Sequence, residues 1–317
     1  MSKQKHKCLV CYLPLTNNEN DYHVTCAKKI FGTTAPPHIS FKHKQLQALA
    51  KQLVINRVSV TGVQPKLSLQ LEKHRNEPSR LTLVGLHGDY ILKPASKEYA
   101  GLPQNEDLTM HLAQIADIKT AQHCLIRLQD GQLGYLTKRF DRVKNKKIAV
   151  EDFCQLTESL TEHKYRGSIE KIVKTAKQHV ANTGFETLRL FELVLFCYLT
   201  GNADMHLKNF ALIENNLGEF EFAPAYDLLN TAIVITSDKE ESALTINGKK
   251  NNLQKKDFNA LAKNLAINDK VLQSIYQRFE AILIQWISFI KQSFLSKTSQ
   301  KHYIKLLKER HVNLFVE

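Results

Sequence analysis

Residues 200 to 209 read Thr-Gly-Asn-Ala-Asp-Met-His-Leu-Lys-Asn, and they follow the most apolar run of the chain, Leu188 to Leu199. Within this stretch Asp204 and Asn209 are separated by four residues, and Asp227 follows in the sequence Ala-Pro-Ala-Tyr-Asp. Phosphotransfer of the protein-kinase type needs such a set, because one Asp accepts the proton of the substrate hydroxyl while an Asn and a later Asp hold magnesium. The alternative is a helix that ends at Gly201, with a few polar surface groups behind it.

The composition limits the classes of protein to be considered. At 317 residues, of which 43% are hydrophobic, the chain is long enough for one large or two ordinary domains. We expect a soluble, cytoplasmic protein without a membrane partner, because no apolar run of membrane-spanning or signal-peptide length is present. The net charge of +13 favours an acidic partner, although the lysines are scattered and a solvated surface accounts for most of them.

Residues 1–35 carry a cluster of soft metal ligands. Cys8 and Cys11 form one close pair, and His23 and Cys26 form a second pair with the same spacing. Two such pairs can enclose a structural, tetrahedral zinc ion and thereby fold a segment that is too short and polar to fold alone. Ordinary reduced thiols beside a surface histidine are the alternative.

The following part of the chain, up to residue 140, is predicted to be rich in β structure. Strands are predicted by period-two alternation or by short apolar runs at Lys66–Leu71, Leu81–Val84, Tyr90–Lys93 and from Leu133 onward. The preceding stretch, Ser-Val-Thr-Gly-Val-Gln-Pro-Lys over residues 59–66, is a turn that can lay backbone amides against phosphates, although a plain β-turn also explains it.

One strand and one helix in this region each carry a charged residue of interest. Lys93 ends a strand, and Glu106 lies at the start of a predicted helix. Protein kinases use a strand Lys and a helix Glu as an ion pair that holds the nucleotide phosphates. Two unrelated surface charges are the alternative.

The pattern becomes helical after about residue 150. Helices are predicted at Glu151–Thr157, Ile169–Val180, Thr187–Leu199 and, as a set, between Asp257 and Leu307. We therefore predict a two-lobed α+β protein. After the Cys/His segment 1–35, a β-rich N-terminal lobe would cover residues 36–140, and an all-helical C-terminal lobe would cover residues 141–317.

Taken in order, these segments resemble the HipA family of serine/threonine kinases, the toxins of bacterial toxin–antitoxin modules. The matching segments are Ser59–Lys66, Tyr90–Pro94, Asn105-Glu106, Lys138–Arg142, Gly201–Phe210 and Tyr226-Asp227. The chain is similar to the shorter HipT branch, in which a separate small protein matches the N-terminal subdomain of the longer members.

The resemblance implies roles for individual residues. Asp204 would be the catalytic base, Asn209 and Asp227 would hold Mg²⁺, and His206 would lie near the ribose of ATP. Further residues expected to contact the nucleotide or support its binding are Gly62, Lys66, Lys93, Glu106, Lys138 and Phe140. Ser59 and Thr61, in the Gly-rich loop, are the expected autophosphorylation sites.

The same resemblance implies a function and partners. The chain would be an ATP-dependent toxin kinase that phosphorylates an aminoacyl-tRNA synthetase, with the glutamyl and tryptophanyl enzymes as family precedents, and so arrests translation and growth. Its antitoxins would include a small protein resembling the missing subdomain and a DNA-binding protein. Two other functions stay open: a basic zinc-knuckle nucleic-acid-binding protein with an inactive kinase-like fold, and a small-molecule or lipid kinase.

Overall fold

The computed structural model describes residues 7–46, 48, 65–73, 78–85, 87–96, 98–143 and 146–316. The predicted site residues Ser59, Thr61 and Gly62 lie outside the described residues. The chain divides into two compact units, the first formed by Met1–Asp107 and Ala121–Phe140 and the second by Leu108–Thr120 and Asp141–Glu317. Across the described ranges, no helix combines the length and the apolar character needed to cross a membrane.

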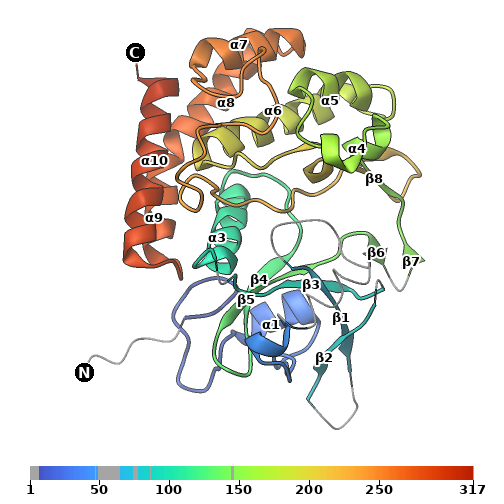
Figure 1. Ribbon diagram of the computed structural model, residues 1–317, viewed down its shortest axis with the longest axis vertical. Helices are drawn as coiled ribbons and strands as arrows, with labels where there is room; N and C mark the ends of the chain where they lie inside the picture. Colours follow the sequence, from blue (N-terminus) through green and yellow to red (C-terminus); the bar gives the residue numbers. More distant parts are fainter. Residues whose placement is uncertain are drawn as a thin grey trace. The chain divides into compact units, whose positions relative to one another are not determined.

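The first unit is built on a five-stranded antiparallel sheet with the strand order β2-β1-β3-β5-β4. Alternation along β1 buries Leu67 and Leu69, which pair with Leu92 and Tyr90 of β3. The elements of this unit are α1 (Val24–Phe31), β1 (Leu67–Glu72), β2 (Arg80–Leu83), β3 (Tyr90–Lys93), the first part of α3 (Leu102–Ile115), β4 (His123–Arg127) and β5 (Leu133–Lys138) (Figure 1).

The four strands predicted here are confirmed as β1, β2, β3 and β5. The bounds of the first three agree to within one residue at each end, whereas β5 begins at Leu133 as predicted but ends at Lys138, four residues before the predicted end at Arg142. Strand β4 was not predicted. Four consecutive residues from His123 to Ile126 are buried, so the strand shows no period-two alternation.

The second unit is mainly helical. Its elements are the rest of α3, β6 (Arg142–Val143), β7 (Lys146–Lys147), β8 (Val150–Asp152), α4 (Phe153–Leu156), η1 (Thr161–His163), α5 (Ile169–Ala176), α6 (Thr183–Thr200), η2 (Leu207–Asn209), β9 (Ala211–Glu214), β10 (Phe220–Phe222), α7 (Lys255–Asn264), α8 (Asp269–Ala281), α9 (Leu283–Gln292) and α10 (Lys297–Phe315).

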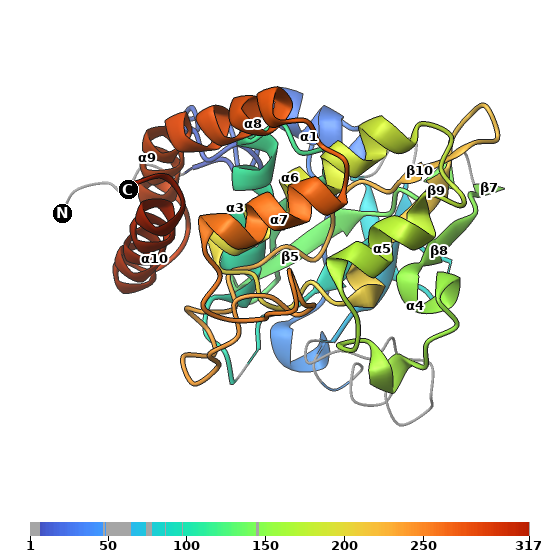
Figure 2. The ribbon, with the colours of Figure 1, turned by 90° about the horizontal axis from the view of Figure 1, so that it is seen from above.

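The prediction of an all-helical second part is wrong in one respect. Strands β8, β9 and β10 form an antiparallel sheet (Figure 2). Strand β6 pairs with β7. The helix predicted over Glu151–Thr157 is instead strand β8 followed by the short α4, which a capping box between Asp152 and Gln155 starts. Strands β8 and β10 have only three residues each, too few to show an alternating pattern, and the first three residues of β9 are all buried, so that strand does not alternate.

The helices of the second unit enclose α6, whose C-terminal half is almost entirely buried. Helix α10 contacts α6, α7, α8 and α9 (Figure 1). The later part of α3 is tied to this set, because the indole of Trp286 donates to the Leu112 carbonyl at 2.9 Å and the hydroxyls of Thr109 and Tyr303 lie 2.9 Å apart. A rigid, buried helix therefore leads directly into the polar stretch that begins at Thr200.

Candidate active site

The C-terminal end of α6 sets the path of the polar stretch. Gly201 has a left-handed backbone with φ of 76° and caps the helix. A Cβ atom there would lie 2.4 Å from the Leu306 side chain and 2.8 Å from Oδ1 of Asn230. Both the backbone angle and the lack of space therefore require glycine at this position.

The loop after Gly201 is closed by hydrogen bonds among its own residues. The amide of Asp204 donates to Oδ1 of Asn202 at 3.1 Å, and Nδ2 of Asn209 donates to the Asp204 carbonyl at 2.8 Å. Asn202, His206 and Asn209 are buried, whereas Asp204 is half-buried. The loop is thus held from within, and the Asp204 carboxylate is more accessible than the other three side chains.

A second segment, containing Asp227, is attached to the same loop. The hydroxyl of Thr231 accepts a hydrogen bond from the Ala203 amide at 2.9 Å, and the Thr231 amide donates to the Gly201 carbonyl at 2.9 Å. The Tyr226 hydroxyl donates to the Lys208 carbonyl at 2.8 Å. Asp227 itself has φ of 55°, a strained conformation that is concentrated at functional sites.

His206 lies within the electrostatic reach of both candidate carboxylates. Burial lowers the pKa of His206 to about 4, aided by Lys164, while the charges of Asp204 and Asp227 act in the opposite direction. Its Nδ1 atom is buried and has no hydrogen-bond partner within the part of the chain that the structure describes. The structure thus brings Asp204, His206, Asn209 and the Asp227 segment together, and the roles assigned to these residues stay predictions.

Sequence reasoning missed Tyr165, whose hydroxyl donates to Oδ1 of Asp204 at 2.6 Å. Its ring meets that of His206 edge to face, with centroids 5.0 Å apart. Burial and the hydrogen bond to Asp204 raise the pKa of this tyrosine. A single tyrosine 39 residues before Asp204 belongs to no motif, so the sequence offered no signal for this contact.

In the first unit, the predicted strand Lys and helix Glu do form an ion pair. Nζ of Lys93 lies 2.6 Å from Oε1 of Glu106, and the two residues are only 4% and 1% exposed. Nζ is also 5.5 Å from the centre of the Tyr135 ring. Because a buried charge is stable only when it is compensated, each partner depends on the other.

The remaining predicted nucleotide contacts of the first unit lie at the ends of strands. Lys66 is half-buried immediately before β1. Lys138 is the last residue of β5, its amide donates to the Gln122 carbonyl at 2.8 Å, and Phe140 is the last residue of the unit. These positions stay predictions, because no contact in the structure tests a role in binding.

The Cys/His cluster of the N-terminal segment is also brought together. One ligand atom from each of Cys8, Cys11, His23 and Cys26 lies within 4.8 Å of all the others. The alternative in which His23 is an unrelated surface residue does not account for this arrangement.

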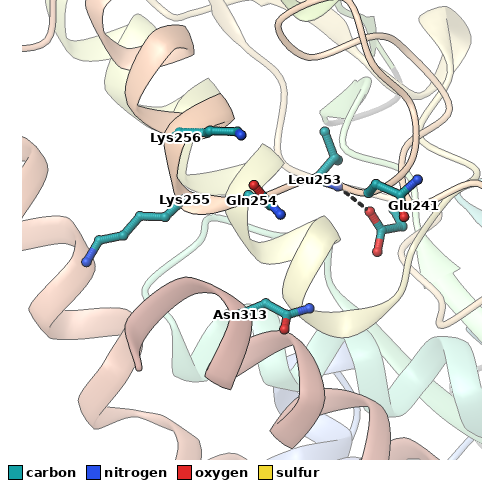
Figure 3. A pocket seen from close by; sticks show the side chains of 7 residues that line it. Glu241, Leu253, Gln254, Lys255, Lys256 and Asn313 are labelled. Carbon is teal, nitrogen blue, oxygen red and sulfur yellow. Dashed lines mark hydrogen bonds between the residues drawn. The ribbon is translucent and has the colours of Figure 1, made fainter. Parts of the chain in front are cut away.

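Two cavities of the second unit have similar volumes, and one of them is lined by a residue of the loop that holds Asp204. One, of about 370 Å³, is lined by Asn209, Phe210 and Tyr226 among others. The other, of about 400 Å³, is lined by residues around α7 and the end of α10, and the Glu241 carboxylate accepts a hydrogen bond there from the Leu253 amide at 2.7 Å (Figure 3). No residue predicted for catalysis lines the second cavity.

The sequence is similar to several curated proteins. It is 28% identical over 244 residues to a Sinorhizobium fredii protein named "Putative kinase Y4dM", covering 71% of this chain and 59% of that protein. It is 29% identical over 195 residues to the "Serine/threonine-protein kinase toxin HipA" of Shewanella oneidensis, covering 55% of this chain and 43% of the toxin. The matches therefore span about half of the length of these two relatives.

A solved structure shares the fold. The chain superimposes with a TM-score of 0.67 on a chain of the complex of HipA, HipB and operator DNA from Shewanella oneidensis MR-1, at 21% identity. The match covers 86% of this chain and 70% of that chain. Residues 58–286 match the family described as the HipA-like C-terminal domain. Since this match includes most of the sequence and the whole of the loop around Asp204, the chain belongs to the HipA-like C-terminal domain family.

Proposed function

We propose that this chain transfers the γ-phosphoryl group of ATP to a serine or threonine hydroxyl of a protein. The observation that carries the proposal is the closed loop that holds Asp204, His206 and Asn209 and is tied to the segment of Asp227. Phosphoryl transfer requires little covalent chemistry from the enzyme, so fixed positions and compensated charges account for most of the catalysis. A loop held by its own hydrogen bonds meets that requirement.

Asp204 would act as the base. Its carboxylate is the accessible group of the loop, and Oδ1 already accepts a hydrogen bond from a hydroxyl, that of Tyr165, at 2.6 Å. A substrate hydroxyl at a similar distance would be within reach for proton transfer.

Asn209 and Asp227 fit a magnesium ion, because amide and carboxylate oxygens are the ligands that this ion prefers. The hydrogen bond from Nδ2 of Asn209 to the Asp204 carbonyl fixes the orientation of the amide, so its Oδ1 points away from that carbonyl. When bound, magnesium would neutralise charge on the ATP phosphates. His206 is neutral at pH 7, and its Nδ1, which has no hydrogen-bond partner among the described residues, suits a contact with a ribose hydroxyl.

Lys93 would contact the phosphates, with Glu106 fixing its position. Lys66, Gly62 and the Lys138–Phe140 segment would contribute further contacts to the nucleotide. The Lys93–Glu106 pair is deeply buried. A buried ion pair stabilises a protein little more than apolar residues of the same volume would, so stability alone does not explain the pair. This supports the role in phosphate binding.

For the substrate we propose an aminoacyl-tRNA synthetase, the glutamyl or the tryptophanyl enzyme, and for the biological role a growth-arresting toxin of the HipT type. A phosphate adds close to two negative charges, and beside an ATP site it would repel the triphosphate and stop tRNA charging. Because the related HipA of Shewanella oneidensis was solved with HipB and operator DNA, we propose a DNA-binding antitoxin as one partner. A small protein resembling the N-terminal subdomain of longer members would be another.

The decisive experiment incubates the purified chain with radiolabelled ATP and Mg²⁺, with and without each synthetase. We expect label on the chain itself and on one synthetase, and none with the Asp204→Asn variant. Label on a lipid or small molecule alone would favour the small-molecule kinase. If the unmodified chain transfers phosphate to no acceptor but binds nucleic acid, the kinase proposal is wrong. The nucleic-acid-binding function then replaces it.

A further inference from the structure

The atoms of the Cys/His cluster are arranged like the ligands of one tetrahedral ion. Nδ1 of His23 lies 3.3 Å from Sγ of Cys11 and 3.9 Å from Sγ of Cys26, and Cys8 completes the group. Around zinc, with bonds of about 2.3 Å to sulfur and about 2.0 Å to nitrogen, neighbouring ligands stand roughly 3.5 Å apart. The described distances need only small changes to reach that geometry.

The other nitrogen of His23 supports the same interpretation. Nε2 lies 3.1 Å from the Pro14 carbonyl, and the Glu19 carboxylate is 3.9 Å away. Since a carbonyl can only accept, Nε2 carries the proton and Nδ1 presents its lone pair to the thiols. Zinc-bound histidines are held in this way by an acceptor at the second nitrogen.

The backbone around the first two cysteines forms a tight turn. The Cys8 amide donates to the Leu13 carbonyl at 2.9 Å, and the Tyr12 amide donates to the Cys8 carbonyl at 3.0 Å. Tyr12 adopts a left-handed conformation with φ of 64°. The turn places Cys8 and Cys11 beside each other and sends the Tyr12 side chain into the interior, where it is 1% exposed.

We propose that Cys8, Cys11, His23 and Cys26 bind one Zn²⁺ ion, and that this ion fixes the start of α3 through Tyr12. The Tyr12 hydroxyl donates to Oδ2 of Asp107 at 2.6 Å. The other oxygen of that carboxylate is 2.7 Å from Nδ1 of His123 on β4.

Two further hydrogen bonds join the metal-binding segment to β4. The Leu125 amide donates to the Leu9 carbonyl at 3.0 Å, and the Tyr22 hydroxyl donates to the Leu125 carbonyl at 2.8 Å. The segment is therefore an integral part of the first unit. Through Tyr12 the segment also contacts Asp107, which is the neighbour of Glu106 in α3. The zinc site would therefore help to hold the helix turn that carries Glu106, the ion-pair partner of Lys93.

The first test measures metal in the whole protein purified without chelators. We expect one zinc per chain in the unmodified protein and in Cys154→Ser, a control at a buried thiol of the second unit, and loss of zinc in Cys11→Ser and Cys26→Ser. Replacement of zinc by Co²⁺ should give the visible absorption of a tetrahedral thiolate site. A folded protein without zinc, or a disulfide within the cluster found by mass spectrometry, would overturn the metal site.

The second test measures amide hydrogen exchange, and it does not depend on the proposed kinase activity. Removal of zinc by a chelator should accelerate exchange in residues 102–107 and 123–127 but not in α10. Tyr12→Phe should keep its zinc and still accelerate exchange in residues 102–107. If zinc is bound but its removal leaves this exchange unchanged, the link to α3 is refuted.

Discussion

The hydroxyl of Tyr165 occupies one oxygen of the Asp204 carboxylate, at a distance of 2.6 Å. The same contact takes a position that an incoming substrate hydroxyl would need.

We therefore expect Tyr165→Phe to raise the rate of phosphate transfer by roughly tenfold, the value of one hydrogen bond to a charged group. Initial rates with a generic acceptor such as casein, and with the chain itself, provide the measurement. Tyr276→Phe, which loses a comparable hydroxyl contact to Asn259 on distant helices, should leave the rate unchanged. A lower rate in Tyr165→Phe would mean that the tyrosine supports the base instead of restraining it.

Replacement of Asp204 and replacement of Asp227 should reduce phosphate transfer in ways that differ in their dependence on Mg²⁺. Asp204→Asn should reduce transfer by ~10²–10⁴-fold at any Mg²⁺ concentration, because the base is removed. Asp227→Asn should also reduce it, but with a higher Mg²⁺ concentration for the half-maximal rate, because a metal ligand is weakened. Asp269→Asn, on the exposed start of α8, is the control. Equal Mg²⁺ dependence in the two site variants would contradict the division of roles.

Because the Lys93–Glu106 ion pair of the first unit is buried, we expect a large loss of stability when one partner is removed. Glu106→Gln removes the carboxylate that pairs with the buried Lys93 charge and should lower the free energy of unfolding by about 3–5 kcal/mol, while raising KM for ATP. The exposed pair Lys119–Glu221, with its atoms 2.7 Å apart, is a matched control. Glu221→Gln should cost less than about 1 kcal/mol in chemical denaturation. Similar losses in the two variants would show that burial of the Lys93 charge has no special cost.

His206 predicts a pH dependence of stability. Its pKa is about 4 in the folded protein and 6.5 in an unperturbed side chain, so the unfolded chain binds more protons between these values. The free energy of unfolding therefore falls as the pH decreases through this window, by roughly 2 kcal/mol between pH 8 and pH 5. His206→Gln should remove this part of the dependence, whereas His179→Gln, at an exposed site, should keep it. Identical pH profiles for the two variants would rule out His206 as the cause.

If Ser59 and Thr61 are phosphorylated by the chain itself, the reaction should reduce the chain's own ATP binding. Mass spectrometry should find phosphate on this loop in active protein and none in Asp204→Asn. Replacement of both residues by Asp should weaken ATP binding, because negative charge would face the triphosphate, while the double Ala variant should bind normally. Tight binding by the Asp pair would exclude the loop as a switch.

The sequence predicted those parts of the site whose residues are close together along the chain or lie in consecutive elements. Asp204 and Asn209 lie in one short loop, and Lys93 ends β3 while Glu106 lies in the second turn of α3, the next helix, so their order along the chain was enough to pair them. Tyr165 reaches Asp204 across 39 residues and Tyr12 reaches Asp107 across 95, and contacts of this kind depend on tertiary packing alone. The β8–β10 sheet was missed for a different reason, because β8 and β10 have three residues each and β9 has a continuous buried run without alternation.

The glycine at the end of α6 has a consequence for how far the functional domain extends. Leu306 of α10 and Asn230 lie so close to Gly201 that no Cβ atom fits there, and Arg310 of the same helix donates a hydrogen bond to the Tyr198 carbonyl. The family match ends at residue 286, before α10 begins. Residues outside the shared domain therefore support the loop that holds Asp204. A chain shortened to the homologous region would keep every side chain proposed to be catalytic and yet lose α10, which packs against the start of their loop.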